Sequence, residues 1–327
     1  MALPASGAIS LSDFNTELGI TAGTAISMSD ADVRALLDLA SGAEASFSGY
    51  YGASSIVDIA LTIAANTNNY NIFSSKGGTY SAGKSNITLT INSGVTVGST
   101  STGTYALETG TGWATGDTIT IVNNGTVKGR GGDGGAGSTV NANNNSNIGP
   151  DSYPNGGNGN AGGNAFRAQF VTTFTNNGSV YGGGGGGGGG GGFQFASGKS
   201  AFIAGGGGGG GGAGVNAGSG GAGGGATFQN VANDFTHSGD SGSSGTSTSG
   251  GAGGYSGGGQ QYQNAAGGNG GGLGSNGSNG TTIATSSTIT GASPSGGSGG
   301  TRGYYQVGST FINSGGGITG TVAGRSG

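Results

Sequence analysis

One stretch of the sequence has the spacing of a phosphate-binding loop. Gly78-Thr-Tyr-Ser-Ala-Gly-Lys84-Ser85 matches the pattern in which backbone amides and a lysine hold phosphate groups. Such a loop needs a helix directly after it, because the amino end of that helix faces the phosphates. Here the next residues are Asn86-Ile-Thr-Leu-Thr-Ile, which alternate as a strand does. Because the chain is rich in Gly, Ser and Thr, we interpret the match as coincidence and predict no nucleotide binding.

The residue types needed for catalysis and metal binding are scarce. The 327 residues include no cysteine, which excludes disulfides, thiolate metal sites and cysteine nucleophiles. The one histidine, His237, lies in a polar Thr-His-Ser-Gly context that is typical of an exposed loop. Asp117, Asp133 and Asp151 lie near glycines but lack the repeated spacing of a calcium site. We therefore predict that the protein is not an enzyme and has neither a metal nor a cofactor.

Composition and charge limit the fold and the partners further. The net charge of −4 gives no attraction to nucleic acid or to an anionic membrane. We see neither a secretory signal nor an apolar run long enough to insert into a membrane. Only 31% of the residues are hydrophobic and 7% are charged, whereas 87 are glycine. The hydrophobic core must therefore be thin, and backbone hydrogen bonds must contribute strongly to stability.

A glycine tract from Tyr181 to Phe228 dominates the second half of the chain. Residues 182–192 and 205–212 are unbroken glycine runs, separated by the insert Phe193–Ala204. One interpretation is a flexible linker, since glycine has the greatest backbone freedom. The other is a bundle of polyglycine type II helices, with three residues per turn and hydrogen bonds between neighbouring helices. We favour the bundle, because the glycines recur to the C-terminus, and we expect the insert to form a loop at its end.

A short strand–corner–strand unit recurs before and after this tract. Strands are predicted over Ile87–Ile91 and Thr118–Val122, where apolar and polar residues alternate. Each corner contains Asn or Ser followed by Gly, which accepts positive φ. Stacked coils of a β-solenoid and hairpins of a β-sandwich would both produce this pattern. The four copies are Ile91-Asn-Ser-Gly-Val-Thr-Val-Gly98, Ile121-Val-Asn-Asn-Gly-Thr-Val-Lys-Gly129, Phe174-Thr-Asn-Asn-Gly-Ser-Val-Tyr-Gly182 and the looser Phe311-Ile-Asn-Ser-Gly-Gly-Gly-Ile-Thr-Gly320.

The first 54 residues have a different character. Two short helices are predicted, Ser10–Gly19 and Ser27–Gly42, the second capped by Ser29. The apolar stripe of the second helix is too small to form a domain alone, so we expect it to dock on another protein or on a second copy. The predicted attachment residues are Phe14, Leu18, Val33, Leu36 and Leu37. The predicted domains are an attachment segment (1–54), a β-repeat domain (55–180) and a glycine-rich tip (181–327).

Aromatic side chains occur in the inserts between the glycine-rich segments. Some of them are expected to cap glycine helices, and others to form an exposed binding rim of the kind that recognition loops use. An arginine beside two tyrosines, Arg302, would add a directional donor for sugars or for a carboxylate. The candidate receptor-binding residues are Phe193, Phe195, Phe202, Tyr255, Tyr262, Arg302, Tyr304 and Tyr305.

The sequence resembles bacteriophage tail proteins in three places. The opening Leu3–Gly19, together with Ser48-Gly-Tyr-Tyr-Gly52, resembles the leader of phage tail structural proteins. The stretch from Ile87 to Gly135, which includes Gly110-Thr-Gly-Trp-Ala-Thr-Gly-Asp117, resembles glycine-rich domains of phage tail tip and fibre proteins. Residues 181–327 are similar to phage tail-fibre adhesins whose tips are bundles of polyglycine helices and whose loops contact the host receptor.

The resemblance implies a non-enzymatic adhesin of the phage virion, made in the host cytoplasm. It would bind a protein or glycan receptor on the host bacterium, assemble with other tail or fibre proteins, and form a homo-oligomer. The alternative is a purely structural fibre shaft or decoration protein; an ice-binding protein is disfavoured by the leader and the aromatic inserts. The expected fold class is mainly β or irregular, with a small helical N-terminal segment, β-solenoid-like or sandwich repeats and a bundle of polyglycine type II helices.

Overall fold

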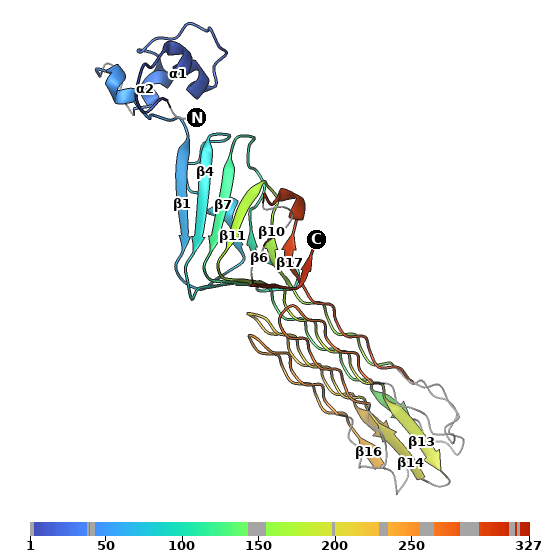
Figure 1. Ribbon diagram of the computed structural model, residues 1–327. Helices are drawn as coiled ribbons and strands as arrows, with labels where there is room; N and C mark the ends of the chain where they lie inside the picture. The colour runs from blue at the N-terminus through green and yellow to red at the C-terminus, as the bar shows by residue number, and fades with distance from the viewer. Residues whose placement is uncertain are drawn as a thin grey trace.

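The molecule is elongated, with its glycine-rich segments at one end and its helices at the other (Figure 1). The computed structural model describes residues 3–37, 39, 43–142, 155–197, 200–228, 235–255, 265–281, 294–313, 318 and 321–327. Within these ranges the structure is mainly β with few helices, as the sequence predicted. None of the helices in this described part is long and apolar enough to cross a membrane.

The N-terminal segment contains two short α-helices, and the first of them agrees with the prediction more closely than the second. Helix α1 (Leu11–Leu18) starts with a capping box between Ser10 and Asp13 and ends at Gly19, whose φ is 67°. Helix α2 (Ala31–Ala35) is shorter than the predicted helix Ser27–Gly42. The residue at its N-cap position is Asp30 and not the predicted Ser29. The Ser29 hydroxyl lies against that of Ser27 and does not cap the helix. A 3-10 helix, η1 (Phe47–Tyr50), follows; the proposed stop at position 42 lies outside the described residues.

Three parallel sheets form the middle of the molecule. In the first sheet each strand pairs in a constant register with the next, for example Ile87 with Ile119, and the other two sheets pair in the same way except for a register shift between the last two strands of the third. The hairpins of a sandwich would need antiparallel pairs, and these three sheets have none among the described residues. The first sheet is β1 (Val57–Ile63), β4 (Ser85–Ile91), β7 (Thr118–Asn123) and β11 (Thr172–Asn176). The second is β2 (Thr67–Asn68), β5 (Thr96–Gly98), β8 (Thr126–Lys128), β12 (Ser179–Tyr181) and β18 (Thr321–Ala323). The third is β3 (Tyr70–Asn71), β6 (Tyr105–Glu108), β10 (Asn164–Arg167), β17 (Tyr304–Val307) and β19 (Arg325–Ser326).

The chain visits the three sheets in a fixed order, and this order explains where the glycine-rich segments enter. It runs from β4 to β5 to β6 and then returns to the first sheet at β7. After β8 the chain leaves for residues 129–163 before it returns at β10, and after β12 it leaves for 182–303 before β17. Both excursions start from the second sheet and end in the third. The β-repeat and glycine-rich regions therefore interleave along the chain instead of dividing at residue 181.

The core of the β region follows the alternation of its strands. In β4 and β7 every second side chain is buried, and the exposed partners are mostly threonines. Short helix α3 (Ile72–Ser75) adds Ile72 to this core. Because the sheets face one another, a single layer of aliphatic and aromatic side chains fills the interior. Its fully buried members include Leu89, Ile91, Val97, Leu107, Ile121, Val127, Phe166 and Val180.

Two glycine runs form the centre of the glycine-rich region. Three successive amides of the first run donate to three different segments: Gly183 to Gly163, Gly184 to Ala213 and Gly185 to Ser275, at 2.8–3.0 Å. The next three amides repeat this pattern with the same segments, and three further segments donate to the carbonyls of the run. In each turn of three residues, the three N–H groups and the three carbonyl groups therefore bond to six different neighbouring segments. Buried backbone groups need such partners. The six segments around 182–192 are 129–138, 155–163, 205–214, 265–272, 275–281 and 294–303.

The second run, 205–212, together with the Ala213 and Gly214 that follow it, lies beside the first and is surrounded in the same way. The outer segments have fewer neighbours, and only they carry side chains at regular positions, such as Ser295, Ser298 and Thr301. A Cβ atom at Gly187 would lie 2.0 Å from the carbonyl oxygen of Gly268, and at residues 183–190 and 205–212 the distance from an added Cβ to the nearest backbone atom is 1.9–2.2 Å. Unbroken glycine is therefore a packing requirement of the two central segments.

Asparagine side chains join the outer segments to one another. The Oδ1 atoms of Asn155 and Asn158 accept the amides of Ser295 and Ser298, both at 2.9 Å. The glycine after each of these asparagines donates its N–H to the carbonyl of the same serine. On other outer segments Asn269, Asn276 and Asn279 accept amides in the same manner. These side chains supply acceptors where an outer segment lacks a backbone neighbour.

Candidate functional site

The helical segment has its own small core, which changes the predicted role of two residues. Phe14 and Val33 are fully buried, together with Leu3 and Tyr50, and the rings of Phe14 and Tyr50 meet edge to face at 5.0 Å. The apolar stripe of α2 was expected to need another protein to cover it. Phe14 and Val33 instead cover each other within the chain and are not available for direct contact with a partner.

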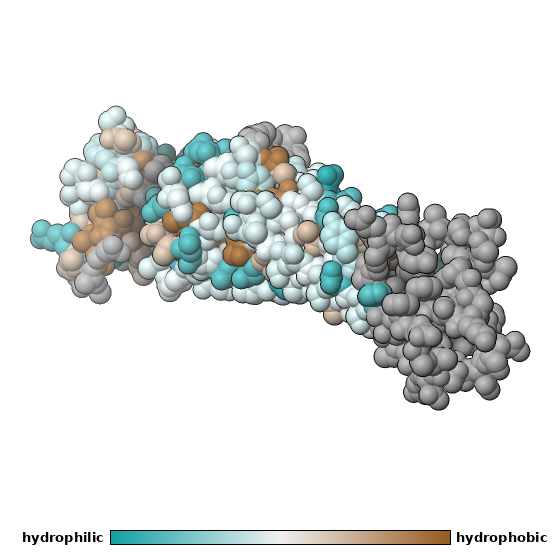
Figure 2. Space-filling model, turned by 90° about the horizontal axis from the view of Figure 1, so that it is seen from below, coloured by the Kyte–Doolittle hydropathy of each residue, from teal (hydrophilic) through white to brown (hydrophobic). Residues whose placement is uncertain are grey.

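Other apolar side chains of this segment are exposed. Leu11, Phe47 and Tyr51 are 43%, 46% and 42% exposed, and we call these three residues the N-terminal apolar surface. In Figure 2 hydrophobic side chains gather at the left end of the molecule, where Figure 1 shows the helices. The Tyr51 hydroxyl donates to the Gly7 carbonyl at 2.6 Å, which holds the ring in place. Sequence periodicity did not reveal this surface, because Phe47 and Tyr51 lie in or beside a 3-10 helix.

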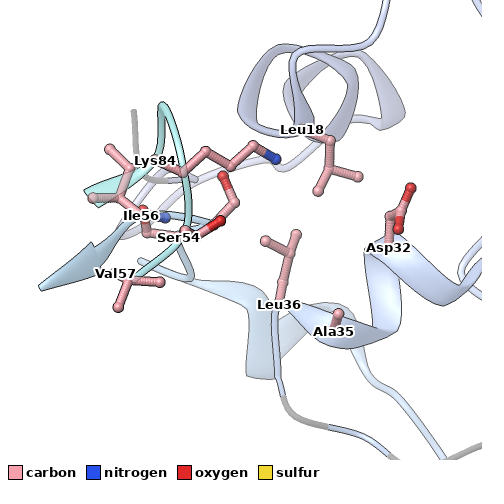
Figure 3. Close-up of a pocket in the computed structure, with 10 residues that line it drawn as sticks. Leu18, Asp32, Ala35, Leu36, Ser54, Ile56, Val57 and Lys84 are labelled. Carbon is pink, nitrogen blue, oxygen red and sulfur yellow. The ribbon is translucent and has the colours of Figure 1, made fainter. Parts of the chain in front are cut away.

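Leu18 and Leu36, two other predicted attachment residues, line a pocket at the junction with the β region. Figure 3 shows both leucines pointing towards Lys84 and towards the chain around Ile56. The pocket holds about 400 Å³, and Asp32 lies on its helical side. Leu37, the last predicted attachment residue, packs on the core of the helical segment. The structure therefore divides the five predicted attachment residues between a core and a junction.

The loop with phosphate-loop spacing surrounds a carboxylate of the same chain. Asp117 is buried and accepts hydrogen bonds from the Tyr80 hydroxyl (2.6 Å) and from the amides of Gly83 (2.8 Å), Ser85 (3.2 Å) and Ala114 (2.9 Å). Burial raises the pKa of the Tyr80 hydroxyl, and its hydrogen bond to Asp117 raises it further. A strand, β4, follows the loop, as predicted. The anion that these amides hold is Asp117.

The predicted receptor-binding residues fall at two different ends of the glycine-rich region. Tyr304 and Tyr305 belong to β17, a strand of the third sheet. The Tyr304 ring lies under the Arg325 guanidinium, with 4.1 Å between the guanidinium carbon and the ring centroid, and Tyr305 packs against the core. Arg302 lies two residues before Tyr304, and its backbone amide donates to the Asn276 side chain. In the part of the chain that the structure describes, these three residues lie in or beside the third sheet and not with β13 and β14.

The opposite end carries the insert between the two glycine runs, and we call it the hairpin end. Strands β13 (Phe193–Ser197) and β14 (Ser200–Ala204) pair antiparallel as the two arms of a hairpin, and they contain Phe193, Phe195 and Phe202. Strand β16 (Phe235–His237) pairs with β14, and nearby β15 (Ala226–Phe228) pairs with β9 (Val140–Ala142). Tyr255 is 63% exposed in the adjoining segment, whereas position 262 lies outside the described residues.

No cluster of metal-ligating side chains is present in the described ranges. The charged groups that contact one another are structural. Arg130 and Asp133 form an ion pair at 3.1 Å, and Asp133 also accepts the Ser219 amide at 2.8 Å. Burial raises the pKa of the Asp133 carboxyl, but the hydrogen bonds from Arg130 and Ser219 outweigh it, so the net pKa is lowered. This carboxylate joins two outer glycine segments.

Comparison with known proteins identifies the family. A model of the family described as phage tail fibre adhesin Gp38 matches residues 58–327, and the chain belongs to this family. Among solved structures, the chain is similar to the crystal structure of the gp37-gp38 adhesin tip complex of the bacteriophage S16 long tail fiber. That match has a TM-score of 0.41 and 20% sequence identity, and it covers 98% of this chain and 99% of the other. A search of curated proteins finds no match.

Family membership gives the chain a place in the virion. A phage tail fibre adhesin is a component of the tail or fibre, and the family is structural and not catalytic. The predicted class of protein, a bacteriophage tail-fibre adhesin, is thereby confirmed. The match begins at residue 58, directly after the helical segment and at the start of β1.

Proposed function

We propose that the protein binds a receptor on the host cell surface with its hairpin end, attaches to other tail fibre proteins with its helical end, and catalyses no reaction. The separation of these two ends supports this division. Between them lie the β sheets and glycine segments, whose central members have no side chains to contact a partner. We therefore assign receptor recognition to the inserts between the glycine segments, because these inserts carry side chains. Other proteins likewise present binding loops on a rigid scaffold.

The two regions between the ends act as a spacer in this proposal. We propose that the β region is a solenoid of three-sided coils, since successive strands add to three parallel sheets in turn. The glycine segments would be polyglycine type II helices, because their hydrogen-bond partners repeat every three residues. The attachment segment would comprise residues 1–54, and the other two proposed domains interleave as described above.

Receptor binding is tested with full-length point variants. Replacing the exposed Tyr255 by alanine should reduce adsorption of the purified protein to host cells and leave the melting temperature unchanged, because little of its ring is buried. Phe195→Ala tests the hairpin itself. The matched control is Tyr304→Ala, since this ring lies at the other end under Arg325. Equal adsorption by all four proteins would instead support a structural fibre component.

Attachment is tested separately at the helical end. Charged replacements at the N-terminal apolar surface, Leu11→Asp and Phe47→Asp, should prevent incorporation into virions while adsorption of the free protein to cells is kept. Val171→Asp is the control, because Val171 is 49% exposed but lies in the β region. If Leu11→Asp and Val171→Asp proteins enter virions equally well, the N-terminal apolar surface is not the attachment site.

A further inference from the structure

Seven asparagines of the chain are followed directly by glycine, the sequence most prone to spontaneous deamidation. In that reaction the glycine amide nitrogen attacks the asparagine side-chain carbonyl carbon, and ammonia leaves as a succinimide ring closes. Water then opens the ring to aspartate or isoaspartate, so that the side-chain NH2 is exchanged for OH. The nitrogen must lose its proton to attack, and a hydrogen bond that holds this N–H slows the reaction. The seven are Asn124, Asn155, Asn158, Asn177, Asn269, Asn276 and Asn279.

Five of these pairs belong to the outer glycine segments, where both reacting groups are held. Each of the five asparagines uses its Oδ1 atom to accept an amide of a neighbouring segment, at 2.8–2.9 Å. Each following glycine donates its own N–H to a carbonyl, for example Gly159 to Ser298 at 2.9 Å and Gly280 to Gly297 at 2.8 Å. The ring can close only after segments separate. Deamidation of these five sites therefore requires local opening of the bundle.

The remaining two pairs occupy equivalent corners of successive coils, and only one of them is protected. In the first corner the Gly125 amide donates to the Oδ1 of Asn123 at 3.1 Å. In the second, the corresponding Oδ1 belongs to Asn176 and accepts the Asn123 side-chain amide at 2.8 Å. Among the described residues the N–H of Gly178 has no acceptor. The same Asn-Asn-Gly sequence thus has two different environments, because one copy lies above the other in the stack.

We propose that Asn177 is the site of spontaneous deamidation in the folded protein. Its side chain is exposed, and within the described ranges the nitrogen that attacks it donates no hydrogen bond. The side-chain amide of Asn177 donates to Asn124 Oδ1 at 3.0 Å, and the reaction removes this donor and places a carboxylate against an oxygen atom. In the isoaspartate product the backbone gains one atom directly before β12, whose Val180 is fully buried. The product is therefore expected to be less stable than the original chain.

The experiment compares all seven sites within one molecule. The full-length protein is incubated at mildly alkaline pH, folded and in parallel in concentrated denaturant, and peptide mapping by mass spectrometry follows each asparagine. In denaturant the seven sites should convert at similar rates. In the folded protein Asn177 should convert at nearly its denatured rate, and the five bundle sites at least about tenfold more slowly, because two hydrogen bonds must break first.

Three results would overturn the proposal: conversion of the bundle sites in step with Asn177, faster conversion at Asn124, or no conversion of Asn177 in the folded state. A matched variant separates modification from other ageing. Asn177→Ala protein stored under the same conditions should keep its melting temperature while that of the original protein falls. Equal decline of both would show that modification at this site has no effect on stability.

Discussion

The Glu17 carboxylate accepts a hydrogen bond from the backbone N–H of Ser55, with 2.6 Å between Oε1 and N. The hydroxyls of Ser54 and Ser55 donate to the same oxygen, both at 3.1 Å, and the Ser55 hydroxyl also donates to the Glu17 carbonyl. Glu17 lies in the last turn of α1, and Ser55 lies two residues before β1. A single buried carboxylate therefore fixes the helical segment to the chain that enters the first sheet.

This contact predicts a dependence on acid. Burial raises the pKa of the Glu17 carboxyl, but the hydrogen bonds from Ser55 and Ser54 outweigh it, and the folded-state pKa is below the ordinary 4.5. The stabilisation is therefore present above the unfolded-state pKa and is lost as the pH falls through the folded-state pKa. Hydrogen exchange of residues 43–57 should accelerate in this range. Glu17→Gln should accelerate it already at neutral pH, whereas Glu44→Gln, at an exposed position, should not.

Central glycines should tolerate no side chain. Gly187→Ala places a Cβ 2.0 Å from the Gly268 carbonyl oxygen, so we expect a loss of about 1–3 kcal/mol or more in the free energy of unfolding. At Gly225 the added Cβ would meet only the Thr139 side chain, at 3.6 Å. Gly225→Ala is the matched control and should change stability by less than about 1 kcal/mol. Thermal melting of both variants decides; similar melting temperatures would contradict close packing around Gly187.

Asparagine side chains on the outer segments should act through their oxygen atom alone. Asn158→Leu removes the acceptor for the Ser298 amide and should cost about 0.5–1.5 kcal/mol in chemical denaturation. Asn158→Asp keeps an acceptor and should cost less. Asn92→Leu serves as the control, because the Asn92 side chain is exposed and makes no hydrogen bond within the described ranges. Equal losses for both Asn158 variants would mean that the hydrogen bond is unimportant.

Asp117 should be essential to the loop that wraps around it. In Asp117→Asn one oxygen becomes an NH2 donor among four donors, so at least one hydrogen bond is replaced by repulsion. Hydrogen bonds to charged groups contribute about 1.5–3 kcal/mol each, and we expect a loss of at least this size. Chemical denaturation measures it, with the exposed Asp240→Asn as control. Equilibrium dialysis should show no ATP binding to the original protein; saturable binding would refute the structural role of the loop.

Local signals in the sequence predicted local structure correctly. The caps of α1 and the strands β4 and β7 depend on residues close together in the chain. The corners were predicted only in part: Gly94 has the expected positive φ of 78°, whereas Gly125 and Gly178 do not have a positive φ. The corner before β18 lies partly outside the described residues, so that copy stays a prediction. Close sequence spacing also allowed the insert Phe193–Ala204 to be placed at an end of the glycine runs. Its alternation was not read as a hairpin.

The positions of several side chains depend on long-range contacts, which local sequence patterns do not reveal. The position of Tyr304 is fixed by β10, where its amide meets the Asn164 side chain across 140 residues of sequence. No local pattern reveals that the chain returns to the sheets there, so Tyr304 and Tyr305 were grouped with the hairpin end. Val33 was likewise assigned to a partner because its cover, Phe14, lies in another helix and Tyr50 comes much later.

The three-residue repeat of the glycine hydrogen bonds also constrains how the gene can change. A run of glycine codons is prone to gain or loss of codons when the replicating strands slip. One codon more or less in residues 182–192 would turn every later amide of that run towards a different neighbouring segment, although the amino-acid composition would hardly change. Three codons would keep every amide of the run facing the same neighbouring segment as before and would lengthen this one segment by one turn. Natural and laboratory length variants should therefore differ by multiples of three glycines.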